Sequence, residues 1–230
     1  MVGNQALIMT IRAIVLPGLD GGADLRVEFV AALAPEFAAT VLAYPNDLAL
    51  DYDGLTEWVR ERLPRDEAFV LIAESFSGPV AIKLAAARPD GLIGVVLTAT
   101  FARALRLASL RFMTGLLPLR KLPMLPAMLL MMGRWSTREW KQRLRVALAA
   151  VDQAVLRRRL LAAATVDVAA LVADIECPIL YLRASRDRIV SPDSWAAIRD
   201  RSHNAVCIGI EGPHMLLQAK PLECAAAVKR

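Results

Sequence analysis

A serine lies between a predicted strand and a predicted helix, in the segment Ala73-Glu74-Ser75-Phe76-Ser77-Gly78. A sharp turn at such a position presents the serine hydroxyl at the carboxyl end of the strand, where it can act as a nucleophile. The tight backbone requires small residues two positions before and after the serine, and Ala73 and Ser77 meet that requirement. Taken alone, the segment is equally typical of a turn that ends a strand and caps a helix.

A serine nucleophile needs a base, and the chain contains only two histidines. His214 follows the last predicted strand, at the edge of the sheet where Ser75 is expected. His203 precedes that strand, so we expect it in a solvated loop at the opposite edge. Asp187 follows the strand predicted at residues 178–182, and we expect its carboxylate to orient the imidazole. The alternative for Asp187 is a surface ion pair with a neighbouring arginine.

The charge that develops on an attacked carbonyl oxygen needs hydrogen-bond donors. We expect one donor to be the backbone N–H of Phe76, the residue after the serine. The other is expected to be that of Leu19, in the glycine-containing loop of residues 17–22, where Gly18 is expected to contact the substrate. A phosphate-binding loop is excluded because no Gly-Lys-Ser/Thr sequence is present and Asp20 would repel an anion.

Alternating strands and helices must position these residues. Apolar runs predict six strands, at residues 11–16, 40–44, 68–73, 92–98, 178–182 and 205–210. Helical spacing between them predicts an α/β fold, with a mostly parallel sheet covered by helices on both faces. Residues 101–174 have only helical patterns, so they are predicted to form an all-helical insertion between core segments 1–100 and 175–230. Within it, Ser136 and Glu139 have the spacing of a capping box.

Composition excludes several classes of protein. A chain of 230 residues with 56% hydrophobic and 22% charged residues can bury a core and is not disordered. Its three cysteines form no CxxC pair and have no histidine at zinc-like spacing, so we predict neither a disulfide framework nor a metal site. Because no apolar segment is long enough to span a bilayer and no signal peptide is recognisable, we expect a cytoplasmic protein.

With these elements, the sequence resembles the α/β-hydrolase family over the whole chain except the first ten residues and the insertion. The order Ser75, Asp187, His214 is that family's order of nucleophile, acid and histidine, and the insertion falls where the family carries its lid. Pro17-Gly18 stands where the family usually has His-Gly, and Ala73 replaces the first glycine of the serine turn. The family's N-terminal two-strand hairpin is expected to be missing.

The resemblance implies a serine hydrolase that cleaves carboxylic esters with an apolar acyl or alcohol part through an acyl-enzyme, without a metal or organic cofactor. A thioesterase or acyltransferase is an alternative, and so is a slow-turnover ligand-binding protein on the same fold. Met113 and Met128 of the insertion are expected to line the substrate pocket, because flexible methionines suit adaptable apolar sites. Alternatively, these residues only bury the inner face of the lid.

Positive charge is concentrated in the insertion. Residues 101–172 contain 13 Lys and Arg against 3 acids, a balance of +10, whereas the remaining residues carry −5. The basic residues are compatible with a solvated helix face, or with a surface that docks an acyl carrier protein or an anionic lipid. Nucleic acid is not expected as a partner, because no segment resembles a recognition module.

Overall fold

A six-stranded sheet forms the centre of the protein, as seen in a computed structural model that describes residues 10–104 and 124–230. The strand order is β2-β1-β3-β4-β5-β6, and every neighbouring pair is parallel. The strands are β1 (Ile11–Leu16), β2 (Phe37–Val41), β3 (Phe69–Glu74), β4 (Leu92–Thr98), β5 (Ile179–Ala184) and β6 (Ala205–Ile210). The predicted parallel sheet of about six strands is confirmed.

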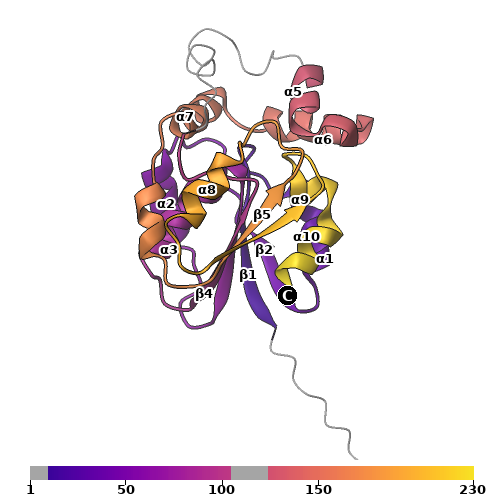
Figure 1. Cartoon of the computed structure of the whole chain (residues 1–230). Coiled ribbons are helices and arrows are strands. Elements are labelled where there is room, and N and C mark those ends of the chain that lie inside the picture. Colours follow the sequence, from indigo (N-terminus) through magenta and orange to yellow (C-terminus); the bar gives the residue numbers. More distant parts are fainter. Residues whose placement is uncertain (1–9, 105–123) are drawn as a thin grey trace, which may run out of the picture.

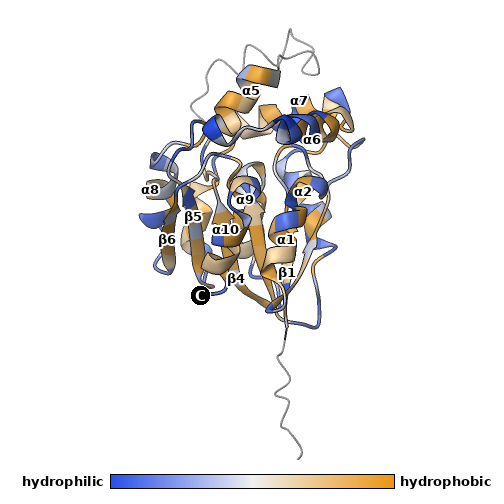
Figure 2. Cartoon of the chain, turned by 90° about the vertical axis from the view of Figure 1, so that its right-hand side faces the viewer, coloured by the Kyte–Doolittle hydropathy of each residue, from blue (hydrophilic) through white to orange (hydrophobic). Residues whose placement is uncertain are grey.

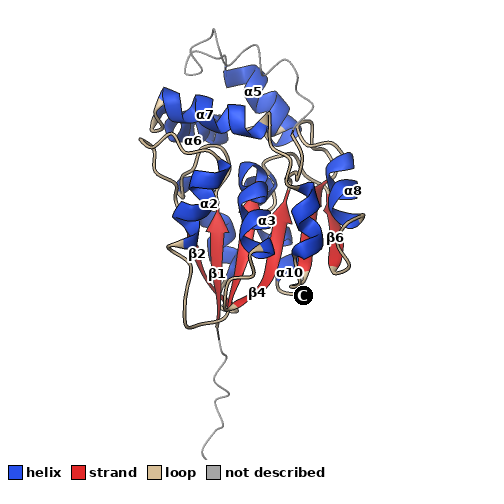
Figure 3. Ribbon diagram, turned by 90° about the vertical axis from the view of Figure 1, so that its left-hand side faces the viewer, coloured by secondary structure: helices blue, strands red, loops and turns tan. Residues whose placement is uncertain are grey.

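Helices cover both faces of this sheet (Figures 1 and 3). One face carries α2 (Tyr52–Arg60), α3 (Gly78–Ala86) and α8 (Asp193–Arg199); the other carries α1 (Val27–Leu33), α9 (Leu216–Ala219) and α10 (Pro221–Val228). Each face buries its own apolar cluster, and Figure 2 shows the hydrophobic strands between the helices. Because β3 lies between two covered faces, Phe69, Leu71, Ile72 and Ala73 are all fully buried.

The second strand begins three residues earlier than the sequence predicts. β2 pairs with β1 from Phe37, opposite Ile11, to Val41, opposite Val15. The chain then leaves the sheet, and the ring of Tyr44 packs edge-on against Trp58 and Phe76, with centroids 6.1 and 6.5 Å away. Tyr44 therefore packs beneath the serine turn rather than in the sheet.

Three helices of the insertion lie across the carboxyl ends of the strands (Figure 1). They are α5 (Met124–Met131), α6 (Arg138–Ala149) and α7 (Gln153–Ala163). Met128 and Leu144 pack with Leu25 and Met215 of the core in one buried cluster. The inserted helices are thus joined to the core by an apolar contact. Residues Ala169–Asp174, a 3-10 helix, pack against α3 instead.

Helix α6 starts one residue later than the predicted capping box requires. The hydroxyl of Thr137 is the N-cap and accepts a hydrogen bond from the backbone N–H of Trp140 at 3.1 Å. Ser136 instead ends the short 3-10 helix Gly133–Trp135, donating its backbone N–H to the Gly133 carbonyl. The prediction of a capping box at Ser136 is therefore wrong, because the backbone N–H of Ser136 is already bonded within the preceding 3-10 turn.

The described residues contain neither a helix that could cross a membrane nor a cluster of metal ligands. None of their helices is both long and apolar enough to cross a bilayer. Across residues 10–104 and 124–230, no three His, Cys, Asp or Glu side chains are grouped so that they could hold a metal ion.

Candidate active site

The serine turn follows β3 and has a strained backbone. Ser75 has a φ of 49°, in the left-handed region that residues other than glycine rarely adopt. Two hydroxyl groups hold the turn: Thr100 donates to the Ser75 carbonyl, and Tyr52 donates to the Phe76 carbonyl at 2.9 Å. A Cβ atom at Gly78 would lie 1.9 Å from Thr100 Oγ1, so only glycine fits there. The strain is therefore maintained by contacts from two other segments, Thr100 after β4 and Tyr52 of α2.

The structure brings the three predicted polar residues into one hydrogen-bonded chain. Ser75 Oγ lies 2.8 Å from His214 Nε2, and His214 Nδ1 lies 2.9 Å from Asp187 Oδ2. The side chains of His214 and Asp187 are almost fully buried. Asp187 Oδ1 accepts the backbone N–H groups of Ile189 and Val190 at 2.8 and 2.9 Å, which fixes the carboxylate beneath the imidazole. Such a chain can move a proton from the serine to the histidine.

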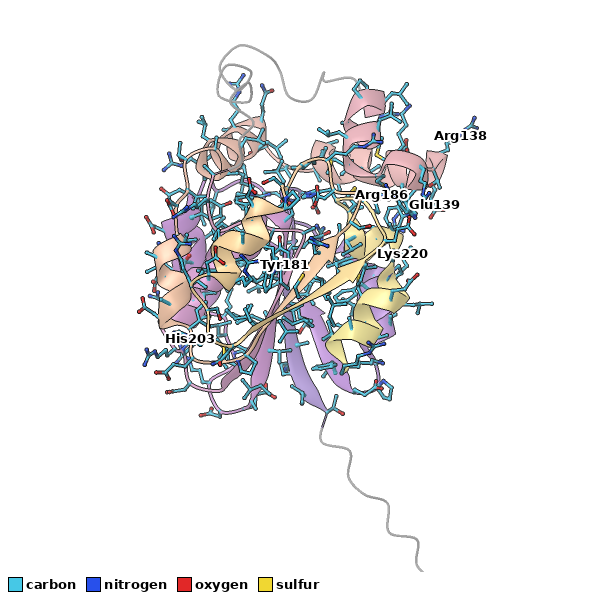
Figure 4. The ribbon with its side chains drawn as sticks, in the orientation of Figure 1. Arg138, Glu139, Tyr181, Arg186, His203 and Lys220 are labelled. Carbon is cyan, nitrogen blue, oxygen red and sulfur yellow. The ribbon has the colours of Figure 1, made fainter. Side chains whose placement is uncertain are left out.

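The second histidine lies elsewhere. Figure 4 shows His203 at the edge of the sheet opposite to the inserted helices, in the loop before β6. It is exposed there. Because the strands are parallel, a residue that precedes a strand cannot reach the edge where Ser75 lies.

The loop of residues 17–22 is tied to the serine turn by a hydroxyl. Ser77 donates to the Pro17 carbonyl, and the Tyr44 hydroxyl, 2.6 Å from Ser77 Oγ, donates to it in turn. In the described part of the chain, the backbone N–H groups of Leu19 and Phe76 donate no hydrogen bond. Both residues line the cavity above Ser75.

A cavity of about 220 Å³ lies between the core and the inserted helices. Ser75, His214 and Gly18 line it on the core side. Apolar side chains of all three described inserted helices line the other side, among them Met131, Leu144 and Leu160.

Of the two methionines predicted to line this pocket, Met128 does not line it. Met128 is fully buried in the cluster beside the cavity, whereas its neighbours Ala127, Leu130 and Met131 face the cavity itself. Met113 lies outside the described residues.

Three buried charged residues beside the serine were not expected from the sequence. Arg26 donates to both carboxylate oxygens of Asp20, at 2.5 and 2.7 Å, and to Glu74 Oε2 at 2.8 Å. Burial alone would lower the pKa of Arg26, but the charges of Asp20 and Glu74 outweigh burial and raise it. The cluster lies at the cavity wall, and Glu74 directly precedes Ser75. The sequence feature that could have indicated this cluster is Glu74, a charged residue at the end of an otherwise apolar strand.

Basic residues of the insertion contact acids of the core. Three of the described ones form ion pairs with core residues: Arg134 with Glu211, Arg143 with Glu28 and Arg158 with Asp51, at 2.8, 2.5 and 2.5 Å. Part of the positive charge predicted to face a partner is therefore used to hold the inserted helices on the core. Docking of an acyl carrier protein or an anionic lipid stays a prediction.

Solved structures of low sequence identity share this architecture. The lipase-esterase related protein from Clostridium acetobutylicum ATCC 824 matches with a TM-score of 0.80 and 14% identity, over 96% of this chain and 95% of that one. The thermophilic esterase from Thermogutta terrifontis matches with 0.78 and 15%, over 95% and 88%. MGS-M2, an alpha/beta hydrolase enzyme from a Medee basin deep-sea metagenome library, matches with 0.76 and 16%, over 99% and 90%.

Comparisons with protein-family models and with curated proteins returned no match. The assignment of the fold therefore rests on the parallel sheet, on the helices over its carboxyl edge and on the agreement with these solved structures over nearly the whole chain. The protein has the α/β-hydrolase fold.

Proposed function

We propose that the protein is a serine hydrolase that cleaves carboxylic esters with a small apolar acyl or alcohol part. The observation that carries the proposal is the hydrogen-bonded chain from Ser75 through His214 to Asp187, which opens into an apolar cavity. The printed names of similar structures, an esterase and a lipase-esterase related protein, support the same reaction class.

In the proposed reaction, each step of ester cleavage is assigned to a group of this site. His214 Nε2 takes the proton of Ser75 Oγ as that oxygen bonds to the ester carbonyl carbon, while Asp187 holds Nδ1–H and stabilises the imidazolium. The N–H groups of Leu19 and Phe76 stabilise the oxyanion. His214 then protonates the leaving alcohol. Water, deprotonated by the same histidine, cleaves the acyl-enzyme to the acid and restores Ser75.

The cavity volume indicates the size of the group that the site can enclose. An apolar cavity of roughly 150 Å³ holds benzene, so the cavity of about 220 Å³ suits a group of roughly six to eight carbon atoms. The charges at its wall are paired with one another in the Asp20–Arg26–Glu74 cluster, and the cluster carries a formal charge of −1.

The test is a panel of p-nitrophenyl esters from acetate to palmitate, with matching thioesters, together with labelling by a fluorophosphonate. We expect the highest kcat/KM for short and medium chains, and a loss of about 10⁴-fold or more for Ser75→Ala. Ser185→Ala is the matched control, because Ser185 is exposed in the loop that precedes Asp187. The proposal fails if the wild type is neither active nor labelled, or if Ser75→Ala behaves like the control.

The same panel separates the alternatives. A preference for thioesters would identify a thioesterase. A burst of one equivalent of p-nitrophenol without further turnover would identify a ligand-binding protein that forms the acyl-enzyme but does not release it.

A further inference from the structure

An arginine of the inserted helix α7 reaches into the core below the cavity. Arg159 is 1% exposed. Its guanidinium donates to the Leu19 carbonyl at 2.9 Å and to the Pro45 carbonyl at 3.1 Å, and lies 5.7 Å from the centre of the Tyr44 ring. One side chain therefore connects the insertion with the loops that follow β1 and β2.

We propose that Arg159 is a positioning residue: it fixes the Leu19–Asp20 peptide group and thereby orients the Leu19 N–H, in the preceding peptide group, toward the substrate oxyanion. This inference rests on the proposed function, because it takes Leu19 as an oxyanion donor. Arg159 is not among the residues that line the cavity. It therefore acts through the loop and not on the substrate.

Three successive carbonyl groups of the loop are held in place. Pro17 O accepts from Ser77, Gly18 O accepts from the Gly21 N–H at 3.0 Å, and Leu19 O accepts from Arg159. In a trans peptide the Gly18 carbonyl and the Leu19 N–H point in opposite directions, so the bond to the Gly18 carbonyl sets the direction of that N–H. The bonds to the Pro17 and Leu19 carbonyls hold the two neighbouring peptide groups. Loss of the Arg159 bond leaves the Leu19 carbonyl without this donor.

Burying a guanidinium requires a large desolvation free energy, so packing alone does not explain Arg159, and we infer a positional role. Burial lowers the pKa of Arg159, and the charge of Asp20 opposes that effect. With Arg159 included, the buried charges of Asp20, Arg26 and Glu74 sum to zero. An apolar side chain of similar volume would pack at lower cost in desolvation, but it could not donate to two carbonyl groups.

The loop is shaped to receive this side chain. Gly21 has a φ of +72°, and a Cβ atom there would lie 2.5 Å from Arg159 Nη1. The same helix contributes Leu160 and Ala163 to the cavity wall. Helix α7 thus contacts the loop through Arg159 and lines the cavity with Leu160 and Ala163, which follow it in the sequence.

The experiment compares Arg159→Met with Arg158→Met on the same helix. Arg158 joins α7 to the core through Asp51 at the surface, so its loss weakens the attachment of the helix without touching the loop. Each variant is assayed with the best ester, and with two ketones of the same acyl chain. The trifluoromethyl ketone forms a tetrahedral adduct with the serine and places an oxyanion at the Leu19 N–H, whereas the methyl ketone only fills the cavity.

For Arg159→Met we expect kcat to fall about 10- to 100-fold with KM within about threefold, less than the full loss of a donor. Affinity for the trifluoromethyl ketone should fall by the same factor, and affinity for the methyl ketone should not change. Arg159→Lys should give an intermediate kcat, because an ammonium group can reach one carbonyl but not both. If Arg159→Met does not fold, as judged by circular dichroism, the lysine variant carries the same comparison.

Two results would overturn the inference. The first is an equal loss of both ketones, and the second is a kcat no lower than that of Arg158→Met. If either occurs while the wild type hydrolyses esters, the proposed function stands and only the role of Arg159 is refuted. A wild type without hydrolysis or serine labelling refutes both together.

Discussion

Replacing Arg26 with methionine leaves two buried carboxylates without their shared cation. Asp20, Arg26 and Glu74 are 6%, 2% and 3% exposed, and the contacts between them are 2.5 to 2.8 Å long. Removing one partner of such a buried pair typically costs about 3–5 kcal/mol, because the remaining charge stays buried. The free energy of unfolding of a domain is only about 5–15 kcal/mol. We therefore expect Arg26→Met to lose a large fraction of its stability.

Urea unfolding followed by circular dichroism measures this loss. With a slope of about 2.5 kcal/mol/M, a cost of about 4 kcal/mol lowers the unfolding midpoint by about 1.5 M. Arg60→Met is the control: Arg60 pairs with Glu57 at 2.5 Å, but both side chains are about half exposed. Exposed pairs contribute about 0–1 kcal/mol, so the midpoint of the control should shift by less than about 0.4 M.

A double-mutant cycle identifies the cause of the loss. Asp20→Asn removes one of the two carboxylates, so adding it to Arg26→Met should recover part of the stability, with a coupling energy of about 1–3 kcal/mol. The reasoning is wrong if Arg26→Met shifts the midpoint no more than Arg60→Met. It is equally wrong if the two substitutions in the cluster are additive, because the loss would then come from packing and not from charge.

Two further changes test other contacts. The hydrogen bond from Arg143 lowers the pKa of Glu28, so the stabilisation it brings is present above pH 4.5, the ordinary value, and disappears as the pH falls through the lowered pKa. Glu28→Gln should therefore reduce the free energy of unfolding by about 0.5 kcal/mol at pH 7 and by less at pH 3; equal thermal shifts at both values would contradict this. Gly78→Ala forces Thr100 away from the Ser75 carbonyl and should cost about 1–3 kcal/mol and most of the ester hydrolysis. Gly22→Ala, whose added atom would come no closer than 3.5 Å to a neighbour, should be nearly neutral in the same assays.

The sequence was sufficient to bring Ser75, Asp187 and His214 to one edge of the sheet because the parallel topology determines where strands end. In a parallel sheet every strand ends at the same edge, so residues that follow three different strands converge there. Ser75, Asp187 and His214 each follow a strand, and the structure brings them within hydrogen-bond distance. The boundaries of the strands mattered little: β2 is shifted from its predicted place, but none of the three residues depends on that strand.

The buried charges could not be found in the same way. Arg26 meets Glu74 across 48 residues, and Arg159 meets Leu19 across 140, so no local spacing connects them. Counting charges along the chain also treats all arginines of the insertion alike. Arg159 is almost fully buried, whereas Arg158, next to it in the sequence, is about half exposed. Which arginines are buried depends on the face that α7 turns toward the core, and Arg157–Arg159 are too uniform to indicate that face.

Ser77 shows how a departure from a family pattern can carry information. The usual residue two positions after the serine is a glycine, which would leave the Pro17 carbonyl without the hydroxyl that it accepts from here. The loop of residues 17–22 also departs from the pattern, with Pro17-Gly18 at its start. The two departures meet at one hydrogen bond, and Tyr44 completes it from a third loop. Ser77 thus holds the Pro17 carbonyl, and Arg159 holds the Leu19 carbonyl of the same loop.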